Sequence, residues 1–255
     1  MRVTILGCSG GVAADLRTTC LMLDDDILID AGTGVGDLTL DEMLRIDTVF
    51  LTHSHLDHTA LLPMLADAVG PRRNTPLMVY ALPETIAILT QNVFNFRLWP
   101  DYTALPSPDK PYVVFRSVTV GQTVELSGRK ISPLPVRHAV PGVAYQLDSG
   151  KASFVFSGDT TYHAPFWDAL NAIGNLHYLM IETTFLNHNK AGAEASGHMR
   201  PELLAHGLKR LNNKAVRLLI THMEPGNEDA TMAEIQAAAG EFNPERLKRG
   251  KVFEF

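Results

Sequence analysis

Three histidines and an aspartate lie within six residues, in the segment THSHLDH at residues 52–58. The segment directly follows an apolar run that is typical of a buried strand. Imidazole and carboxylate ligands suit borderline cations such as zinc. In an extended or turning loop, His53 and His55 point the same way, whereas Asp57 and His58 point toward a second metal. A solvated histidine-rich loop is the alternative interpretation of this segment alone.

Three polar residues downstream also follow β-rich runs. His138 lies in PVRHAVP, Asp159 in FSGDT and His222 in LITHM. Each of these residues taken alone is more often structural than functional. Metal and substrate sites gather at strand ends, however, because the scaffold holds side chains rigidly there. The recurrence in this order therefore predicts that His138, Asp159 and His222 join the first segment in one metal site.

The strands and helices that must position these residues follow an uneven order along the chain. Several strands precede each pair of helices, which does not fit a simple βαβ alternation. Two sheets that face inward, with helices outside, fit this order better. We expect one domain over residues 1–255, because no linker rich in Pro, Gly or Ser divides the chain. The predicted strands are 2–6, 19–23, 27–30, 48–51, 112–115, 123–126, 130–136, 142–147, 153–157, 178–182, 217–221 and 251–255, and the predicted helices are 38–44, 61–69, 83–94, 164–172, 201–211 and 230–240.

The composition is that of a globular protein, with 45% apolar residues and a formal net charge of −6. A protein that binds a long polyanion usually carries a basic field instead, so long nucleic acid is disfavoured as a partner. The two cysteines, Cys8 and Cys20, provide neither a disulfide framework nor a CxxC metal site. The apolar run at the N-terminus is too short for a signal peptide, and no other stretch approaches a membrane span. We therefore expect a cytoplasmic protein that does not enter a membrane.

Four motifs resemble, in their order, those of the metallo-β-lactamase superfamily: THSHLDH at 52–58, RHAVPG at 137–142, SGDTT at 157–161 and ITHMEPG at 220–226. Within it, the chain is similar to the branch shared by ribonuclease Z and the class II 3′,5′-cyclic-nucleotide phosphodiesterases. The leucine in HSHLDH favours the phosphodiesterases. The segments LGCSGG, LIDAG, ETTF and GHM also match this branch. The resemblance implies an α/β fold, a four-layer αβ/βα sandwich of two mixed β-sheets flanked by helices.

The resemblance also implies two groups of ligands for two divalent cations, joined by one bridging residue. Carried over residue by residue, these are His53, His55 and His138; Asp57, His58 and His222; and the bridging Asp159. Asp30 would accept a hydrogen bond from a ligand histidine and fix its tautomer. The alternative for Asp30 is a turn residue at a strand end. Zinc is the expected metal, although manganese and iron accept the same ligands.

The expected reaction is hydrolysis of a phosphodiester by a metal-bridging hydroxide. Two divalent cations, the carboxylates of Asp57 and Asp159 and one hydroxide leave a charge of about +1, which favours a monoanionic phosphodiester. Zinc lowers the pKa of a bound water to roughly 7, so hydroxide forms at neutral pH. Asp57 would also take the hydroxide proton.

A leaving alkoxide needs a proton, and the ribonuclease Z-like pattern implies His198, paired with Glu182, as the general acid. The same pattern often has Ser-Thr after this histidine. Because this chain has Met199 and Arg200 there, we expect the surroundings of the acid to differ.

Several functions are compatible with such a site. The first is a phosphodiesterase for a 3′,5′-cyclic nucleotide of the cAMP type, or for another small phosphodiester. The second is a ribonuclease Z-like nuclease; such nucleases usually carry a long basic arm that binds transfer RNA, and residues 139–158 leave no room for it. The third is a hydrolase of a sulfate ester, lactone or thioester, which the same hydroxide would attack. A non-enzymatic metal-binding module is the fourth, disfavoured because no ligand position is missing.

An aromatic-rich stretch contains Phe94, Phe96, Trp99 and Tyr102. We interpret it as core plus a subunit interface, and the family also favours a homodimer. The alternative is a lid whose aromatic ring stacks on a nucleobase.

Overall fold

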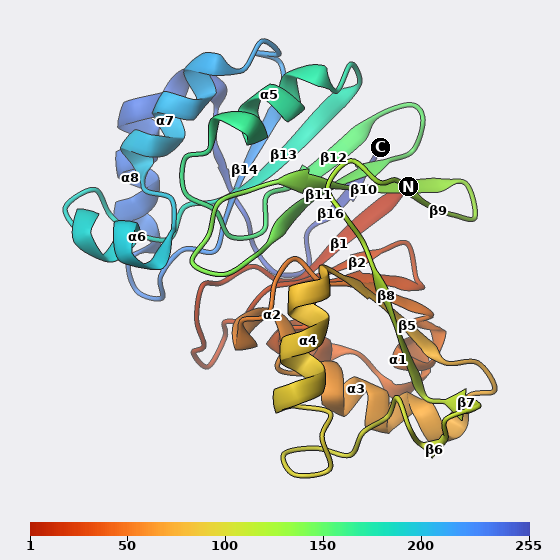
Figure 1. The fold of residues 1–255 in the computed structure, drawn as a ribbon. Coiled ribbons are helices and arrows are strands. Elements are labelled where there is room, and N and C mark those ends of the chain that lie inside the picture. The colour runs from red at the N-terminus through yellow and green to blue at the C-terminus, as the bar shows by residue number, and fades with distance from the viewer.

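Two seven-stranded mixed sheets form the centre of the molecule, shown in Figure 1 as a computed structural model that describes residues 1–255. In the first sheet, the four strands β16, β1, β2 and β3 pair antiparallel, and β3, β4, β5 and β8 run parallel. Its order is β16 (Val252–Glu254), β1 (Arg2–Gly7), β2 (Cys20–Leu23), β3 (Ile27–Ile29), β4 (Thr48–Phe50), β5 (Leu77–Ala81) and β8 (Val113–Ser117).

The second sheet has the same division into a parallel and an antiparallel part. Its first four strands run parallel and the remaining strands pair antiparallel. Its order is β15 (Glu245–Arg246), β14 (Arg217–Thr221), β13 (Leu176–Glu182), β12 (Ser153–Phe156), β11 (Val143–Asp148), β10 (Arg129–Pro135) and β9 (Val124–Leu126). A separate two-stranded ribbon joins β6 (Pro106–Ser107) to β7 (Lys110–Pro111).

Helices cover the outer faces of both sheets (Figure 1). The first half contributes α1 (Leu40–Arg45), α2 (Leu56–Thr59), α3 (Leu62–Val69) and α4 (Pro83–Asn92), and the second half α5 (Ala164–Ala172), α6 (Lys190–Ser196), α7 (Pro201–Arg210) and α8 (Glu228–Ala239). Short 3-10 helices are η1 (Thr33–Asp37), η2 (Gly70–Arg72) and η3 (Gly240–Phe242). No helix combines the length and the apolar character that crossing a membrane requires.

Three apolar clusters hold these layers together. One lies between the sheets, where the ring of Phe50 in the first sheet meets that of Tyr145 in the second with centroids 5.5 Å apart. The other two lie beneath the helices of each half. Burial of apolar area on both faces of each sheet is the main force that joins the layers. The expected four-layer αβ/βα sandwich is therefore confirmed.

Local sequence explains several of the element boundaries. Thr39 caps α1 through a capping box with Glu42, so the helix begins at Leu40 rather than at the predicted Leu38. Proline occupies the first turn of α4, α5 and α7, where its missing N–H costs no helical hydrogen bond. The central strands β4 and β12 are buried throughout, because layers cover both of their faces.

Several elements were not predicted from the sequence, among them β5, α2, α6 and the two-residue strands β6, β7 and β15. The five-residue strand β5 is an apolar run of a length that periodicity alone cannot assign, and its pairing with β4 and β8 decides its conformation. The single-turn helix α2 lies inside the histidine-rich segment, and α6 lies in a polar stretch before Gly197. The glycine-rich stretch that follows Ala31 forms the 3-10 helix η1.

Polar residues follow the parallel strands at the edge where both sheets end. In the first sheet, Asp30 directly follows β3, and the histidine-rich segment follows the neighbouring β4. In the second sheet, Asp159 follows β12, Glu182 ends β13 and His222 directly follows β14. Because parallel strands end on the same side, their carboxyl ends bring residues that are distant in sequence into one crevice.

Candidate metal centre

The first group of ligand atoms comes from His53, His55, His138 and Asp159, which all lie within 4.8 Å of one another. His53 follows β4, His55 precedes the first turn of α2, and His138 follows β10. The Nδ1 atom of His55 lies 3.1 Å from Nε2 of His138. The Oδ2 atom of Asp159 lies 3.5 Å from Nε2 of His53 and 3.9 Å from Nε2 of His138. Four donors from both sheets therefore face one point.

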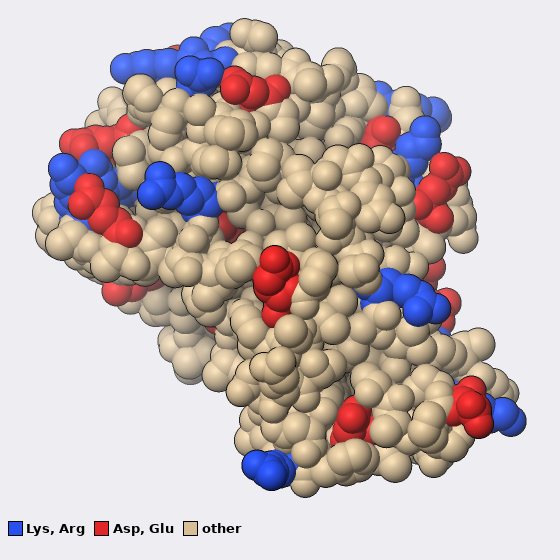
Figure 2. Space-filling view, in the orientation of Figure 1, with Lys and Arg blue, Asp and Glu red and all other residues tan.

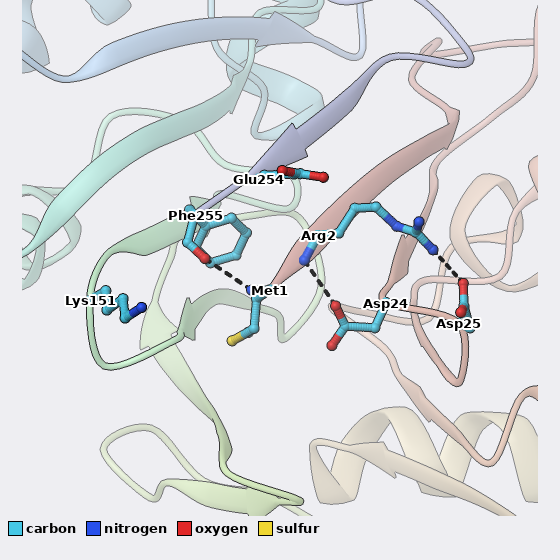
Figure 3. A pocket seen from close by; sticks show the side chains of 7 residues that line it. All are labelled: Met1, Arg2, Asp24, Asp25, Lys151, Glu254 and Phe255. Carbon is cyan, nitrogen blue, oxygen red and sulfur yellow. Dashed lines mark hydrogen bonds and ion pairs between the residues drawn. The ribbon is translucent and has the colours of Figure 1, made fainter.

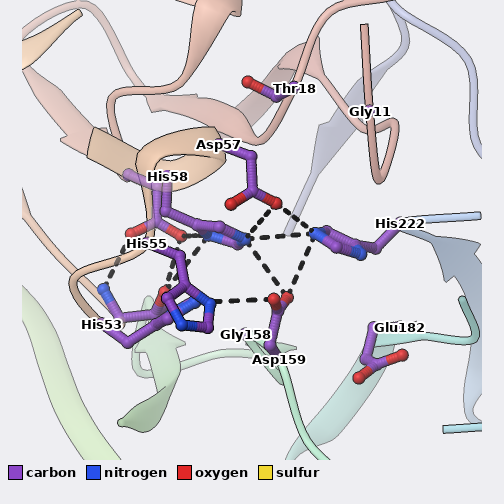
Figure 4. A network of polar contacts seen from close by, with 12 residues as sticks. Gly11, Thr18, His53, His55, Asp57, His58, Gly158, Asp159, Glu182 and His222 are labelled. Atoms are coloured by element: carbon purple, nitrogen blue, oxygen red, sulfur yellow. Dashed lines mark hydrogen bonds and ion pairs between the residues drawn. The ribbon is translucent and has the colours of Figure 1, made fainter. Parts of the chain in front are cut away.

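The second group consists of Asp57, His58, His222 and again Asp159 (Figure 4). The single turn of α2 presents Asp57 and His58 together, and β14 brings in His222. The Nε2 atom of His222 lies 3.0 Å from Oδ2 of Asp57 and 3.2 Å from Nε2 of His58. The Oδ1 atom of Asp159 lies 3.2 Å from Nε2 of His58 and 3.4 Å from Nε2 of His222. The two carboxylate oxygens of Asp159 thus face different groups.

The donor set fits two divalent cations. Both carboxylate oxygens of Asp159 and Nε2 of His53 are buried without any hydrogen-bond partner. Such atoms are costly to bury unless another group, such as a cation, satisfies them. Ligands about 2.0–2.1 Å from a tetrahedral zinc ion lie about 3.3 Å from one another, which is close to the separations found in both groups. The residues predicted as ligands are therefore brought together as expected, with Asp159 between the groups.

The pKa shifts of several donors favour the deprotonated forms that can bind a cation. Burial lowers the pKa of His53 well below its usual value, which leaves the imidazole neutral and able to bind a metal. Burial raises the pKa of Asp159, but the imidazoles of His222, His58 and His53 outweigh it and hold that pKa well below its usual value. Asp57 is likewise ionised, because the imidazoles of His222 and His58 lower its pKa more than burial raises it.

Asp30 holds the candidate ligand His58 from outside the centre. Its Oδ2 atom accepts a hydrogen bond from Nδ1 of His58 at 2.7 Å, so Nε2 of that ring faces the two groups. The backbone N–H and the hydroxyl of Thr52 also donate to the carboxylate of Asp30, at 2.7 and 2.8 Å. Asp30 is completely buried, and the arrangement agrees with the expected role in fixing a tautomer.

Glu182 and His198 form the expected pair. The Oε1 atom of Glu182 lies 2.8 Å from Nδ1 of His198, and Nε2 of that ring lies 4.0 Å from Oδ2 of Asp159. The backbone N–H groups of Thr160, Thr184 and Met199 also donate to this fully buried carboxylate, at 2.9, 3.2 and 3.1 Å. Glu182 therefore has no free lone pair for a cation and serves to hold His198.

Met199 and Arg200 stand next to His198, where the family pattern often has Ser-Thr. The side chain of Met199 is buried in the apolar cluster beneath the helices of the second half. Arg200 precedes the first turn of α7 and is nearly buried. Burial lowers the pKa of His198, but the charges of Glu182, Asp159 and Asp57 outweigh it and raise the pKa to about 9.

Backbone strain concentrates at two of these positions. Asp30 and His222 have φ values of 61° and 60°, in the left-handed region that non-glycine residues rarely adopt. The backbone N–H of His222 donates to the carbonyl of Cys8 at 2.8 Å, which ties the strained residue to the N-terminal loop. A Cβ atom at Gly10 would lie 2.7 Å from the carbonyl oxygen of His222, so the loop can pack this closely only with glycine there.

Three threonines contribute to the centre without having been assigned a role from the sequence. Thr52, Thr160 and Thr184 each donate to Asp30 or Glu182. All three lie inside or next to the motifs of the histidines and acids, so their positions were visible. The carboxylate partners of Thr52 and Thr160, however, lie 22 residues away, and the contact of Thr184 with Glu182 depends on side-chain direction, which the sequence does not specify.

Two surface cavities differ in their relation to this centre. A cavity of about 400 Å³ borders the centre at His138 and Gly197, and Arg137 and Tyr162 also line it. A wider cavity of about 670 Å³ lies at the chain ends, where Figure 3 shows no histidine (Met1, Arg2, Asp24, Asp25, Lys151, Glu254 and Phe255). Only the first adjoins residues that could act in chemistry.

Residues 25–223 match the family model described as a beta-lactamase superfamily domain. The chain belongs to the beta-lactamase superfamily. The matched range contains both ligand groups and the Glu182–His198 pair. This superfamily member therefore combines the four-layer metallo-β-lactamase fold with a cluster of histidines and aspartates that could hold metal ions.

Two curated relatives of this superfamily member carry different names. A ribonuclease Z from Bradyrhizobium diazoefficiens is 30% identical over 169 residues, which cover 63% of this chain and 51% of that protein. A probable 3′,5′-cyclic-nucleotide phosphodiesterase from Yersinia pestis is 25% identical over 88% of this chain and 78% of that protein. The match to the ribonuclease thus spans only about half of its length.

The fold of this superfamily member is also similar to that of unliganded yeast PDE1, with a TM-score of 0.83. The alignment covers 100% of this chain and 99% of PDE1 at 18% sequence identity. At this identity, the similarity establishes the fold.

Proposed function

We propose that this chain is a dinuclear metal-dependent phosphodiesterase that hydrolyses a small phosphodiester, a 3′,5′-cyclic nucleotide. The observation that carries the proposal is the place of Asp159, whose two oxygens face two complete ligand groups. His198, whose Nε2 atom lies 4.0 Å from Oδ2 of Asp159, lies beside the same carboxylate. Two-metal centres with an adjacent proton donor suit the in-line displacement of an alkoxide from phosphorus.

Each residue of the centre has a distinct role in this proposal. Two divalent cations, which we propose to be zinc, would supply an activated water and positive charge that faces the phosphate oxygens. Asp159 fixes the separation of the two ligand groups. Asp57, whose side chain is 29% exposed whereas that of Asp159 is buried, is placed to take a proton from the attacking water.

His198 is the proposed general acid. Its Nδ1 atom is held by Glu182, so the proton that it can donate is on Nε2, the atom that faces the centre. Against the effect of burial, the charges of Glu182, Asp159 and Asp57 raise the pKa of the ring to about 9 in the metal-free centre, which favours the protonated form. It can therefore give its proton to the leaving alkoxide, which is a poor leaving group without one.

A cyclic nucleotide is favoured over transfer RNA by the connection between His138 and Asp159. The antiparallel strands β11 and β12 and their short turn fill this connection, at the place where an arm for transfer RNA is expected. On the face shown in Figure 2, basic and acidic side chains are interspersed, and the net charge is −6. A surface of this kind offers little attraction for a long polyanion. The cavity beside His138 is within the range of small-ligand sites.

A panel of substrates tests the proposal. Protein loaded with zinc or manganese should hydrolyse bis(p-nitrophenyl) phosphate and cyclic AMP. A precursor transfer RNA, a lactone and a sulfate ester should be poor substrates by comparison. Activity on the lactone or the sulfate ester, with none on either phosphodiester, would overturn the proposed function. Cleavage of the precursor transfer RNA at a rate above that of cyclic AMP would instead favour the nuclease.

A further inference from the structure

The hydroxyl of Thr184 lies among three polar groups of the centre. Its Oγ1 atom is 3.0 Å from Nδ1 of His222, 3.0 Å from Oε2 of Glu182 and 3.3 Å from Nδ1 of His198. Thr184 is 6% exposed and Glu182 is completely buried, so water does not compete for these contacts. One hydroxyl therefore connects a candidate metal ligand to the carboxylate that holds the candidate acid.

The direction of these hydrogen bonds follows from which atom of His222 faces the centre. Its Nε2 atom lies 3.0 Å from Asp57, so a ring that binds a cation there carries its proton on Nδ1. That N–H donates to Oγ1 of Thr184. The single proton of the threonine hydroxyl then donates to Oε2 of Glu182, the only carboxylate in reach. The other oxygen of the same carboxylate accepts from Nδ1 of His198.

The first sheet contains the same arrangement. The hydroxyl of Thr52 lies 3.0 Å from Nδ1 of His53 and donates to Oδ2 of Asp30 at 2.8 Å. Asp30 also accepts directly from His58 at 2.7 Å. Each sheet thus supplies one buried carboxylate that holds one imidazole directly and a second through a threonine hydroxyl. The same threonine–carboxylate–imidazole arrangement thus occurs twice, once in each sheet. This repetition argues for a role of the threonine hydroxyls at the centre.

We propose that Thr184 is a positioning residue that orients His222 toward one cation and couples it to His198 through Glu182. Thr52 does the same for His53 at the other cation. Without the hydroxyl of Thr184, the N–H of His222 has no acceptor, and the ring is free to turn or to change tautomer. Changes to such outer partners typically reduce metal affinity or activity about 10- to 100-fold. The inference rests on the metal-binding part of the proposed function, and its main test needs no substrate.

Four variants distinguish the loss of either threonine hydroxyl from a general effect of substitution in the core. Thr184→Val removes the hydroxyl at nearly constant volume, and Thr184→Ser restores it. Thr52→Val makes the same change in the first sheet. Thr231→Val is the matched control, because the hydroxyl of Thr231 is buried on α8 without any hydrogen-bond partner. Zinc affinity is measured for each variant by competition with a chromogenic chelator, which yields two stepwise constants.

We expect Thr184→Val to weaken one of the two zinc constants about 10- to 100-fold and Thr52→Val to weaken the other. Thr231→Val should leave both constants unchanged, and Thr184→Ser should recover most of the loss. The inference is overturned if Thr184→Val binds both zinc ions as the control does, or if the serine variant is no better than the valine variant.

Imidazole NMR spectra of the zinc-loaded wild-type protein provide a second readout that does not depend on any variant folding. They should show His222 with its proton on Nδ1 and its metal on Nε2. The opposite tautomer would contradict the proposed hydrogen bonds from His222 to Thr184 and from Thr184 to Glu182. If the protein binds two zinc ions with these properties but hydrolyses no phosphodiester, the proposed function fails and the positioning role stands.

Discussion

The Nε2 atoms of His58 and His222 lie 3.2 Å apart. When both rings bind a cation through Nε2, neither of these atoms carries a proton. Two lone pairs at this distance repel each other unless a positive charge lies between them. A proton satisfies the pair only in part, whereas a divalent cation satisfies both rings and Asp57 as well. This contact therefore links the stability of the centre to its metal.

Removal of metal should lower the thermal stability of the protein. A ligand at 100 times its dissociation constant adds about 2.7 kcal/mol to folding, and 1 kcal/mol moves the Tm of a domain of this size by about 2–4 °C. We therefore expect treatment with a chelator to lower Tm by roughly 5–10 °C and zinc to restore it. Differential scanning calorimetry measures the change, and an unaltered Tm would contradict it.

Asp159→Asn should disrupt both metal groups at once. The amide keeps the shape of the carboxylate but has one neutral oxygen and one nitrogen that cannot bind a cation, whereas both oxygens of Asp159 face ligand groups. We expect metal content to fall from two ions to one or fewer and turnover to fall more than about 100-fold. Elemental analysis of the dialysed protein measures the content, with the exposed Asp229→Asn as the control. Retention of two ions would show that Asp159 does not bridge them.

His198→Ala should separate catalysis from metal binding. If His198 is the proton donor that we propose, two metals should remain without it, because Glu182 keeps its backbone donors, while kcat falls about 10²- to 10⁴-fold. The exposed His188→Ala is the matched control. An unchanged kcat in His198→Ala would refute the acid assignment.

The dependence of kcat on pH should reflect the ionisation of His198. The pKa of His198 is raised to about 9, so the ring is protonated below that pH and loses its catalytic proton above it. Nearby cations disfavour the protonated ring and move this limb to lower pH. We expect kcat to fall with rising pH at or below about 9, and this limb should be absent in His198→Ala.

Metal binding should release protons near neutral pH. Burial lowers the pKa of His58, but Asp159 and Asp30 outweigh it and raise the pKa well above its usual value. The ring is thus protonated in metal-free protein at pH 7 and must lose its Nε2 proton to bind a cation. Calorimetric titration with zinc in buffers of different ionisation enthalpy counts the protons. Asp30→Asn, which removes one of the raising charges, should reduce the count.

The grouping of the candidate ligands could be predicted because each lies in a short motif that follows an apolar strand. The spatial grouping of Asp57 with His222 followed from the resemblance, and the structure places their side chains 3.0 Å apart. The roles of Thr52 and Thr184 could not be predicted, because a hydroxyl's partner depends on neighbouring strands and on rotamers. Strand β5 was missed because short apolar runs acquire their conformation from pairing.

The aromatic stretch shows a similar division between what is confirmed and what stays a prediction. Phe94 and Tyr102 are buried in the apolar cluster beneath the helices of the first half, as expected for core residues. Phe96 is 64% exposed and the neighbouring Leu98 is 68% exposed. A subunit interface or a lid at these two side chains stays a prediction, as does the homodimer.

Each ligand group draws its donors from both halves of the chain, and this order has a consequence for biosynthesis. His53 and Asp57 leave the ribosome long before His138, Asp159 and His222, so a nascent chain cannot complete either group. The histidines of the first half therefore have no complete set of partners until the strands of the second sheet have been synthesised. A product that ends before His222 therefore lacks a donor of the second group and is released without a complete centre.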